Sequence, residues 1–224
     1  MAEFSYQDYA YQKIRNDIIF CRLAPGQKLS AKALETELEV GRTPIRESLV
    51  RLTELHLVYT VPQSGTYVSK IDMHAAENAR FIREHLERSV SIACCSCITD
   101  EGRATLSECI SQEEAALCER DAEAFFTLDN QFHKLLFDIA GRSWVWRWIQ
   151  VCDVDLERYR WLRTQVDTLE WEVIMEQHRL IYEAICTGNT EEAAYISVAH
   201  MHLMITEQET VLATFPDYFA PTES

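Results

Sequence analysis

The chain has 224 residues and a formal net charge of −15 at pH 7, and this length suffices for two small domains. No apolar run approaches the roughly 18 residues of a transmembrane helix, which argues against a membrane protein. No signal peptide is recognisable, so the eight cysteines are expected to be reduced in a cytoplasmic protein.

The charge is divided unevenly along the chain. Residues 1–70 hold 9 Lys and Arg against 8 Asp and Glu, whereas residues 71–224 hold 12 against 28. Solubility is the simplest explanation for the acidity of the second part, and an acidic partner-binding surface is the alternative. The nearly neutral first part can still bind nucleic acid through basic residues on one face.

The first part has the pattern of a winged helix. Apolar spacing predicts an amphipathic helix over residues 11–20 and a short helix over 31–38. After a tight turn at 39–41, a second helix is expected from residue 42, with Ile45, Leu49, Leu52 and Leu55 forming its apolar stripe. Two β-rich runs at 58–61 and 66–69 flank a Pro-Gln-Ser-Gly turn, which predicts a hairpin.

The start of the second helix carries the residues suited to reading DNA. Its first turn contains Arg42 and Arg46, which lie four residues apart and so share one helix face. Pro44 suits a first helical turn, where its missing N–H costs nothing. In a helix-turn-helix this end enters the major groove, and arginine there contacts guanine edges or phosphate.

The second part predicts a bundle of antiparallel helices. Little strand signal follows residue 72, and apolar residues recur at helical spacing. Six helices are expected, at 73–97, 101–118, 121–140, 143–163, 168–187 and 190–213. The overall fold is therefore mainly α: a winged helix-turn-helix domain over 1–70, then an antiparallel six-helix bundle within 71–224. The tail after residue 214 is expected to be irregular.

One group of side chains in the bundle could bind a metal ion. Asp129 and His133 share a helix face at i and i+4, and His178 and His200 lie on the last two predicted helices. Three imidazoles and a carboxylate would suit zinc, nickel or manganese. The alternative is that they are unrelated surface or paired residues. His202 should point elsewhere on its helix.

The first part resembles the GntR family of bacterial transcription regulators, most specifically in the run R-T-P-I-R-E-S-L. The resemblance implies DNA contacts by Arg42, Thr43 and Arg46, with Lys32 and the wing residues Ser64 and Gly65 nearby. Three positions depart from the family pattern: Gly41 replaces a Ser or Thr cap, and Glu39 and His56 replace glycines. Both of the latter are expected to need a positive φ, at a cost of about 1–2 kcal/mol.

The second part resembles the FCD domain of the FadR-type branch of that family, in its shorter VanR-like form. The matching runs are L-D-N-Q-F-H-K-L-L at 128–136, E-Q-H at 176–178 and A-H at 199–200. The resemblance implies a divalent metal held by Asp129, His133, His178 and His200. It also implies that Arg83 binds an effector carboxylate, whereas a surface ion pair with Glu87 is the alternative.

Together these features predict a DNA-binding regulator, more often a repressor in such families, that is not an enzyme. A homodimer would read a palindromic operator in double-stranded DNA. The expected effector is a sugar acid, hydroxy acid or dicarboxylate bound at the metal. Two alternatives stay open: a metal-dependent enzyme acting on organic acids, and a dimerisation module whose metal is structural.

Overall fold

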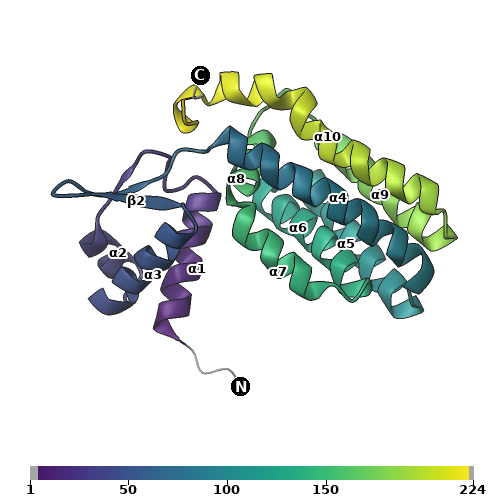
Figure 1. Ribbon diagram of the computed structural model, residues 1–224, viewed down its shortest axis with the longest axis horizontal. Coiled ribbons are helices and arrows are strands. Elements are labelled where there is room, and N and C mark those ends of the chain that lie inside the picture. Colours follow the sequence, from purple (N-terminus) through teal and green to yellow (C-terminus); the bar gives the residue numbers. More distant parts are fainter. Residues whose placement is uncertain (1–4, 222–224) are drawn as a thin grey trace.

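The computed structural model describes residues 5–221 and consists of a small N-terminal domain beside a larger helical bundle (Figure 1). No helix within that range combines the length and apolar character needed to cross a bilayer. The elements of the N-terminal domain are α1 (Tyr6–Ile19), β1 (Lys28–Leu29), α2 (Ala31–Glu37), α3 (Arg42–Glu54), β2 (Val58–Val61) and β3 (Gly65–Val68). The expected helix-turn-helix with a wing is confirmed.

The wing is a three-stranded antiparallel sheet of order β1-β3-β2. Strand β2 pairs with β3 from Val58 opposite Val68 to Val61 opposite Gly65. Beneath the wing, the three helices bury a common apolar core that includes Ile14, Ile45 and Leu52, all fully buried. The wing tip is left to project away from the rest of the molecule (Figure 1).

The helix ends confirm the two expected departures from ordinary backbone geometry. Glu39 and His56 have φ values of 54° and 57°. After α3, the amide of His56 donates to Thr53 and that of Leu57 donates to Leu52. This pairing is a Schellman C-cap, in which the left-handed residue is usually glycine. Gly41 caps the start of α3 without a side-chain hydrogen bond.

The second domain is an all-helical bundle, but one expected helix is divided in two. Its elements are α4 (Met73–Cys97), α5 (Asp100–Glu119), α6 (Ala122–Ile139), α7 (Ser143–Cys152), α8 (Val154–Thr164), α9 (Glu172–Thr187) and α10 (Thr190–Thr214). The segment 143–163 breaks at Asp153, which ends α7 and begins α8. The described part of the bundle therefore has seven helices. The Asp153 carboxylate is buried and faces Arg83, with Asp153 Oδ2 3.9 Å from Arg83 Nη1.

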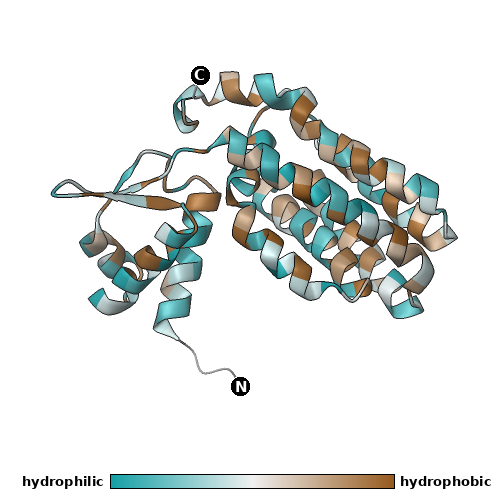
Figure 2. Cartoon of the chain, in the orientation of Figure 1, coloured by the Kyte–Doolittle hydropathy of each residue, from teal (hydrophilic) through white to brown (hydrophobic). Residues whose placement is uncertain are grey.

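Apolar residues concentrate where the helices face one another (Figure 2). The long helices α4 and α10 pack together, as do α5 with α6 and α9 with α10. The tail also differs from expectation: Pro216–Tyr218 forms a 3₁₀ turn, and Phe219 forms a β-bridge with Ile71 in the interdomain linker. The C-terminal segment therefore returns to the junction between the domains.

Helix α8 makes the main polar contacts across that junction. Arg15 of α1 forms an ion pair with Glu157 at 2.5 Å. The buried Arg158 donates from Nη2 to the carbonyl of Ser69 at 2.7 Å. The Phe20 ring meets Trp161 edge-on, with centroids 4.8 Å apart. One helix of the bundle thus contacts both the first helix and the wing end of the N-terminal domain.

Replacing Glu39 tests the strain between α2 and α3. Glu39→Gly is expected to raise the free energy of unfolding by about 1 kcal/mol, because glycine adopts positive φ without a Cβ clash. Urea denaturation followed by circular dichroism measures this change. Glu39→Ala is the matched control, because it removes the same carboxylate and keeps the strain. Equal stability of the two variants would show that the backbone is unstrained there.

Candidate functional site

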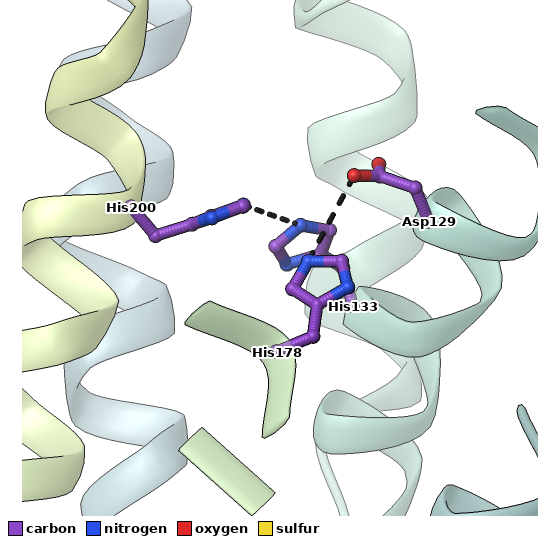
Figure 3. A group of neighbouring side chains, drawn as sticks. All are labelled: Asp129, His133, His178 and His200. Atoms are coloured by element: carbon purple, nitrogen blue, oxygen red, sulfur yellow. Dashed lines mark hydrogen bonds and ion pairs between the residues drawn. The ribbon is translucent and has the colours of Figure 1, made fainter. Parts of the chain in front are cut away.

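The structure brings the four predicted metal-ligating residues together in the centre of the bundle. Asp129 and His133 project from α6, His178 from α9 and His200 from α10 (Figure 3). All four are buried, and one ligand atom from each lies within 4.8 Å of the others. The i, i+4 spacing sets the first pair on one face of α6, and the helices of the bundle supply the rest. His202 faces away and contacts Glu84 on the surface.

A side-chain oxygen lies behind each imidazole. The contacts of His178 and His200 are hydrogen bonds, whereas that of His133 is an ion-pair contact without hydrogen-bond geometry. His133 Nδ1 lies 2.6 Å from Glu87 Oε2, and His178 Nδ1 lies 3.1 Å from both oxygens of Glu113. His200 Nδ1 lies 2.9 Å from Gln177 Oε1. An acceptor at Nδ1 fixes the ring and directs the Nε2 lone pair the other way. Metal-binding histidines characteristically have such outer partners.

The inner faces of the three rings fit a cation. His133 and His200 place their Nε2 atoms 3.2 Å apart, close to the roughly 2.9–3.4 Å separating two nitrogens that share one ion at about 2.1 Å. The Nε2 atom of His178 is buried without a hydrogen-bond partner among the described residues, and Asp129 Oδ1 lies 3.8 Å from it. A single divalent ion would bind the facing Nε2 atoms of His133 and His200 together with the unpartnered Nε2 atom of His178.

Burial sets the charge states around this centre. It lowers the pKa of His178 and His200 well below the usual value, with further lowering from the neighbouring His133. These rings are therefore neutral at pH 7, as metal ligation requires. Burial also raises the pKa of Glu113 to about 8. For Glu87 burial acts in the same direction, but the charges of Arg83 and then His133 outweigh it and hold the pKa well below normal.

Arg83 occupies a different place from the expected one. The ion pair with Glu87 forms, at 2.6 Å from Nε to Oε1, but in the interior and not on the surface. Arg83 Nη1 and Nη2 have no hydrogen-bond partner in the described chain. The residue is absent from the wall of the cavity beside the metal-ligating group. Arg83 thus contacts Glu87, which also contacts His133. The binding of an effector carboxylate by Arg83 stays a prediction.

Two arginines of α8, Arg160 and Arg163, line this cavity, and Arg160 is the one that contacts the metal-ligating group. Its guanidinium makes a close ion pair with Asp129 Oδ2, and Nη1 donates to Asn130 Oδ1 at 2.9 Å. The cavity has a volume of about 50 Å³, and its wall includes Asp129, His200 and Arg160. A small molecule in it could therefore contact the ligand group and one guanidinium.

A second candidate surface lies on the N-terminal domain. Arg42, Thr43 and Arg46 are exposed at the start of α3, and no described carboxylate pairs with either arginine. They line adjoining surface hollows that continue to Ala31 of α2 and to Thr66 of the wing. The exposed Lys32 and Ser64, and the half-buried Gly65 next to Lys28, lie on these same two elements. Recognition helix and wing therefore form one basic, solvent-facing region.

A winged helix-turn-helix joined to a helical domain with a buried polar centre defines a DNA-binding transcription regulator. Residues 7–68 match the model of the bacterial regulatory proteins of the gntR family, and residues 79–203 match the FCD domain. The HTH-type transcriptional repressor RspR of Escherichia coli K12 is 33% identical over 175 residues, covering 78% of this chain and 76% of that protein. The chain belongs to the GntR family and carries an FCD domain.

Other relatives agree with this assignment. An HTH-type regulator from an unstable DNA locus of Streptomyces ambofaciens is 30% identical over 210 residues, covering 94% of this chain and 88% of that protein. The solved structure of E. coli McbR/YncC superposes with a TM-score of 0.81 over 95% of this chain and all of that one, at 18% identity. A GntR regulator from Rhodococcus sp. RHA1 gives 0.75 over 94% of this chain and 99% of that one, at 20% identity. At such identities these two structures establish the fold alone. The chain is a regulator and not an enzyme.

Removing an outer partner tests the metal site without touching a ligand. Glu113→Ala is expected to weaken Zn²⁺ binding by about 10–100-fold, because His178 loses the acceptor that orients it. Competition with a chromophoric chelator measures the affinity. Glu114→Ala is the matched control, because Glu114 is the next residue in the chain but pairs with Arg179 at the surface. An equal loss in both variants would contradict a specific role for Glu113.

Proposed function

We propose that the protein is a homodimeric repressor whose affinity for a palindromic operator is controlled by a small carboxylate bound at a metal ion in the bundle. The convergence of three histidines and an aspartate, each histidine backed by a side-chain oxygen, is the observation that carries this proposal. The repressor role is supported by the similarity to RspR, which is a transcriptional repressor. As a bacterial DNA-binding regulator, the protein would act in the cytoplasm.

The proposed DNA contacts follow from the exposed start of α3. Arg42, Thr43 and Arg46 would enter the major groove, where an arginine forks onto guanine O6 and N7 or contacts phosphate. Lys32 and the wing at Ser64 and Gly65 would contact the adjacent backbone. One domain of this size reads only a few base pairs, which is why a two-fold pair on an inverted repeat is proposed.

The proposed cofactor is zinc, nickel or manganese, held by Asp129, His133, His178 and His200. Four protein ligands leave positions open on an octahedral ion, and a carboxylate oxygen is a suitable further ligand. A cavity that touches Asp129 and His200 supports ligand access to the ion. This contact favours a sensing role over a purely structural metal, which would need no adjoining cavity.

Helix α8 is the proposed route from the cavity to the DNA-binding domain. On one side it presents Arg160 to Asp129, and on the other it presents Glu157 to Arg15 and Arg158 to Ser69. A shift of α8 on effector binding would change contacts with α1 and the linker together. A 10–100-fold change in operator affinity needs about 1.4–2.7 kcal/mol of coupling.

In vitro selection from random DNA duplexes identifies an operator sequence. Binding to that sequence then tests the proposed DNA contacts of α3. The wild-type protein is expected to enrich an inverted repeat. Arg46→Ala is expected to lose specific binding to it, by 10-fold or more, because a bidentate base contact contributes about 1–3 kcal/mol. Fluorescence anisotropy at fixed salt measures the affinity.

The control for that loss is Arg120→Ala, which removes the same charge from the exposed surface of the bundle. Its operator affinity should match the wild type. Unchanged binding by Arg46→Ala would remove this residue from the recognition surface, and enrichment of an asymmetric single site would contradict the two-fold pair.

A further inference from the structure

The cavity beside the metal-ligating group is mostly apolar. It is small, at about 50 Å³, and its apolar wall includes Phe125, Phe126, Leu156, Met201 and Met204. Pockets for drug-sized ligands typically measure about 300–1,000 Å³, so only a compact ligand fits. Methionine side chains are flexible and polarizable, which lets this wall adapt to a flat or branched apolar group.

The polar side chains of the wall are largely occupied by protein partners. Tyr159 donates its hydroxyl hydrogen to the Met204 carbonyl at 2.9 Å, and Thr164 donates to the Trp161 carbonyl at 2.7 Å. The charge of Arg163 is matched by Glu207, which it contacts through Nε and Nη2 at 2.6 and 2.8 Å, leaving only Nη1 unpartnered. Apart from Arg163 Nη1 and Arg160, the wall therefore offers few groups to which additional ligand hydroxyls or a second carboxylate could bind.

Arg160 differs from the other polar residues of the wall, because its partner Asp129 is one of the proposed metal ligands. Its guanidinium lies against the Phe126 ring, 5.5 Å from the centroid, and pairs with Asp129. A divalent ion held by Asp129 and the three histidines would share the Asp129 carboxylate with Arg160, so this side of the cavity would carry excess positive charge. One ligand carboxylate there would offset part of that charge, and a guanidinium suits such an anion.

We infer that the effector is a small monocarboxylate with an apolar aromatic or branched aliphatic body. Its carboxylate bridges the metal ion and Arg160, and its body lies among Phe125, Phe126, Met201 and Met204. The inference rests on the proposed function and narrows it, because sugar acids, hydroxy acids and dicarboxylates expected from the sequence would bury polar groups without partners. Each such group costs roughly 5- to 150-fold in affinity.

Calorimetric titration of the full chain tests this inference, after elemental analysis has established one metal ion per protomer. The probes are benzoate, the matched neutral benzamide, and the polar acids gluconate and malate. Benzoate is expected to bind at least 10-fold more tightly than gluconate or malate, and benzamide is expected not to bind measurably. Arg160→Gln should retain its metal and lose at least 10-fold in benzoate affinity.

Arg179→Gln is the control variant, because Arg179 is exposed and pairs with Glu114 and Glu176 away from the cavity. It should bind benzoate like the wild type. Preference for gluconate or malate, equal binding of benzamide, no binding of benzoate, or unchanged affinity in Arg160→Gln would each overturn the inference. If the metal-loaded protein then still changes its operator affinity with another organic acid, the proposed function holds and only the inference fails. A protein that takes up no metal overturns both.

Discussion

Buried charge in the centre of the bundle is the constraint on which the rest of the second domain depends. Ionised carboxylates and guanidinium groups are costly to remove from water unless each finds an opposite charge or a hydrogen-bond partner. Glu87 meets this requirement between Arg83 and His133, both in close contact with it. Asp129 meets it with Arg160. These contacts link α4 to α6 and α6 to α8. The imidazoles of α9 and α10 have their own partners, Glu113 for His178 and Gln177 for His200.

The same requirement links the bundle to the DNA-binding domain. Arg83 also faces Asp153, where α7 ends and α8 begins, and one turn later Glu157 pairs with Arg15 of α1. The metal-ligating group, the helix break and the interdomain contact thus lie along one set of buried and partly buried charges. A change at the metal would alter which partners Asp129 and Arg160 keep, and α8 carries both Arg160 and the interdomain contacts. Coupling through this helix is a hypothesis that requires two arrangements of α8.

Local patterns were sufficient to predict the N-terminal domain. The turn residues and the apolar stripe from Ile45 to Leu55 depend on neighbours in sequence, and the structure agrees with them. The positive φ at Glu39 and His56 follows from the family resemblance, and the structure agrees with it as well. Asp129 and His133 could also be placed on one face by spacing alone. Their meeting with His178 and His200 depends on how three helices pack, which spacing does not determine.

What sequence reasoning missed depends on tertiary contacts. Glu113 had a usable signal, since it interrupts the stripe of Leu106, Cys109, Ile110 and Ala116 with a fully buried acid. Gln177 and Glu87 carried no comparable signal for a role behind a histidine. Arg160 could not be separated from Arg158 because both lie on α8, yet one faces Asp129 and the other Ser69. The break falls at Asp153, which is buried and faces Arg83, a residue 70 positions away in sequence.

The most direct measurement is elemental mass spectrometry of the full chain, purified without a histidine tag or chelator. The account predicts about one divalent ion per protomer. No bound ion, even after soaking with zinc, nickel and manganese salts, would contradict it. The three histidines would then serve only to fill the polar centre of the bundle.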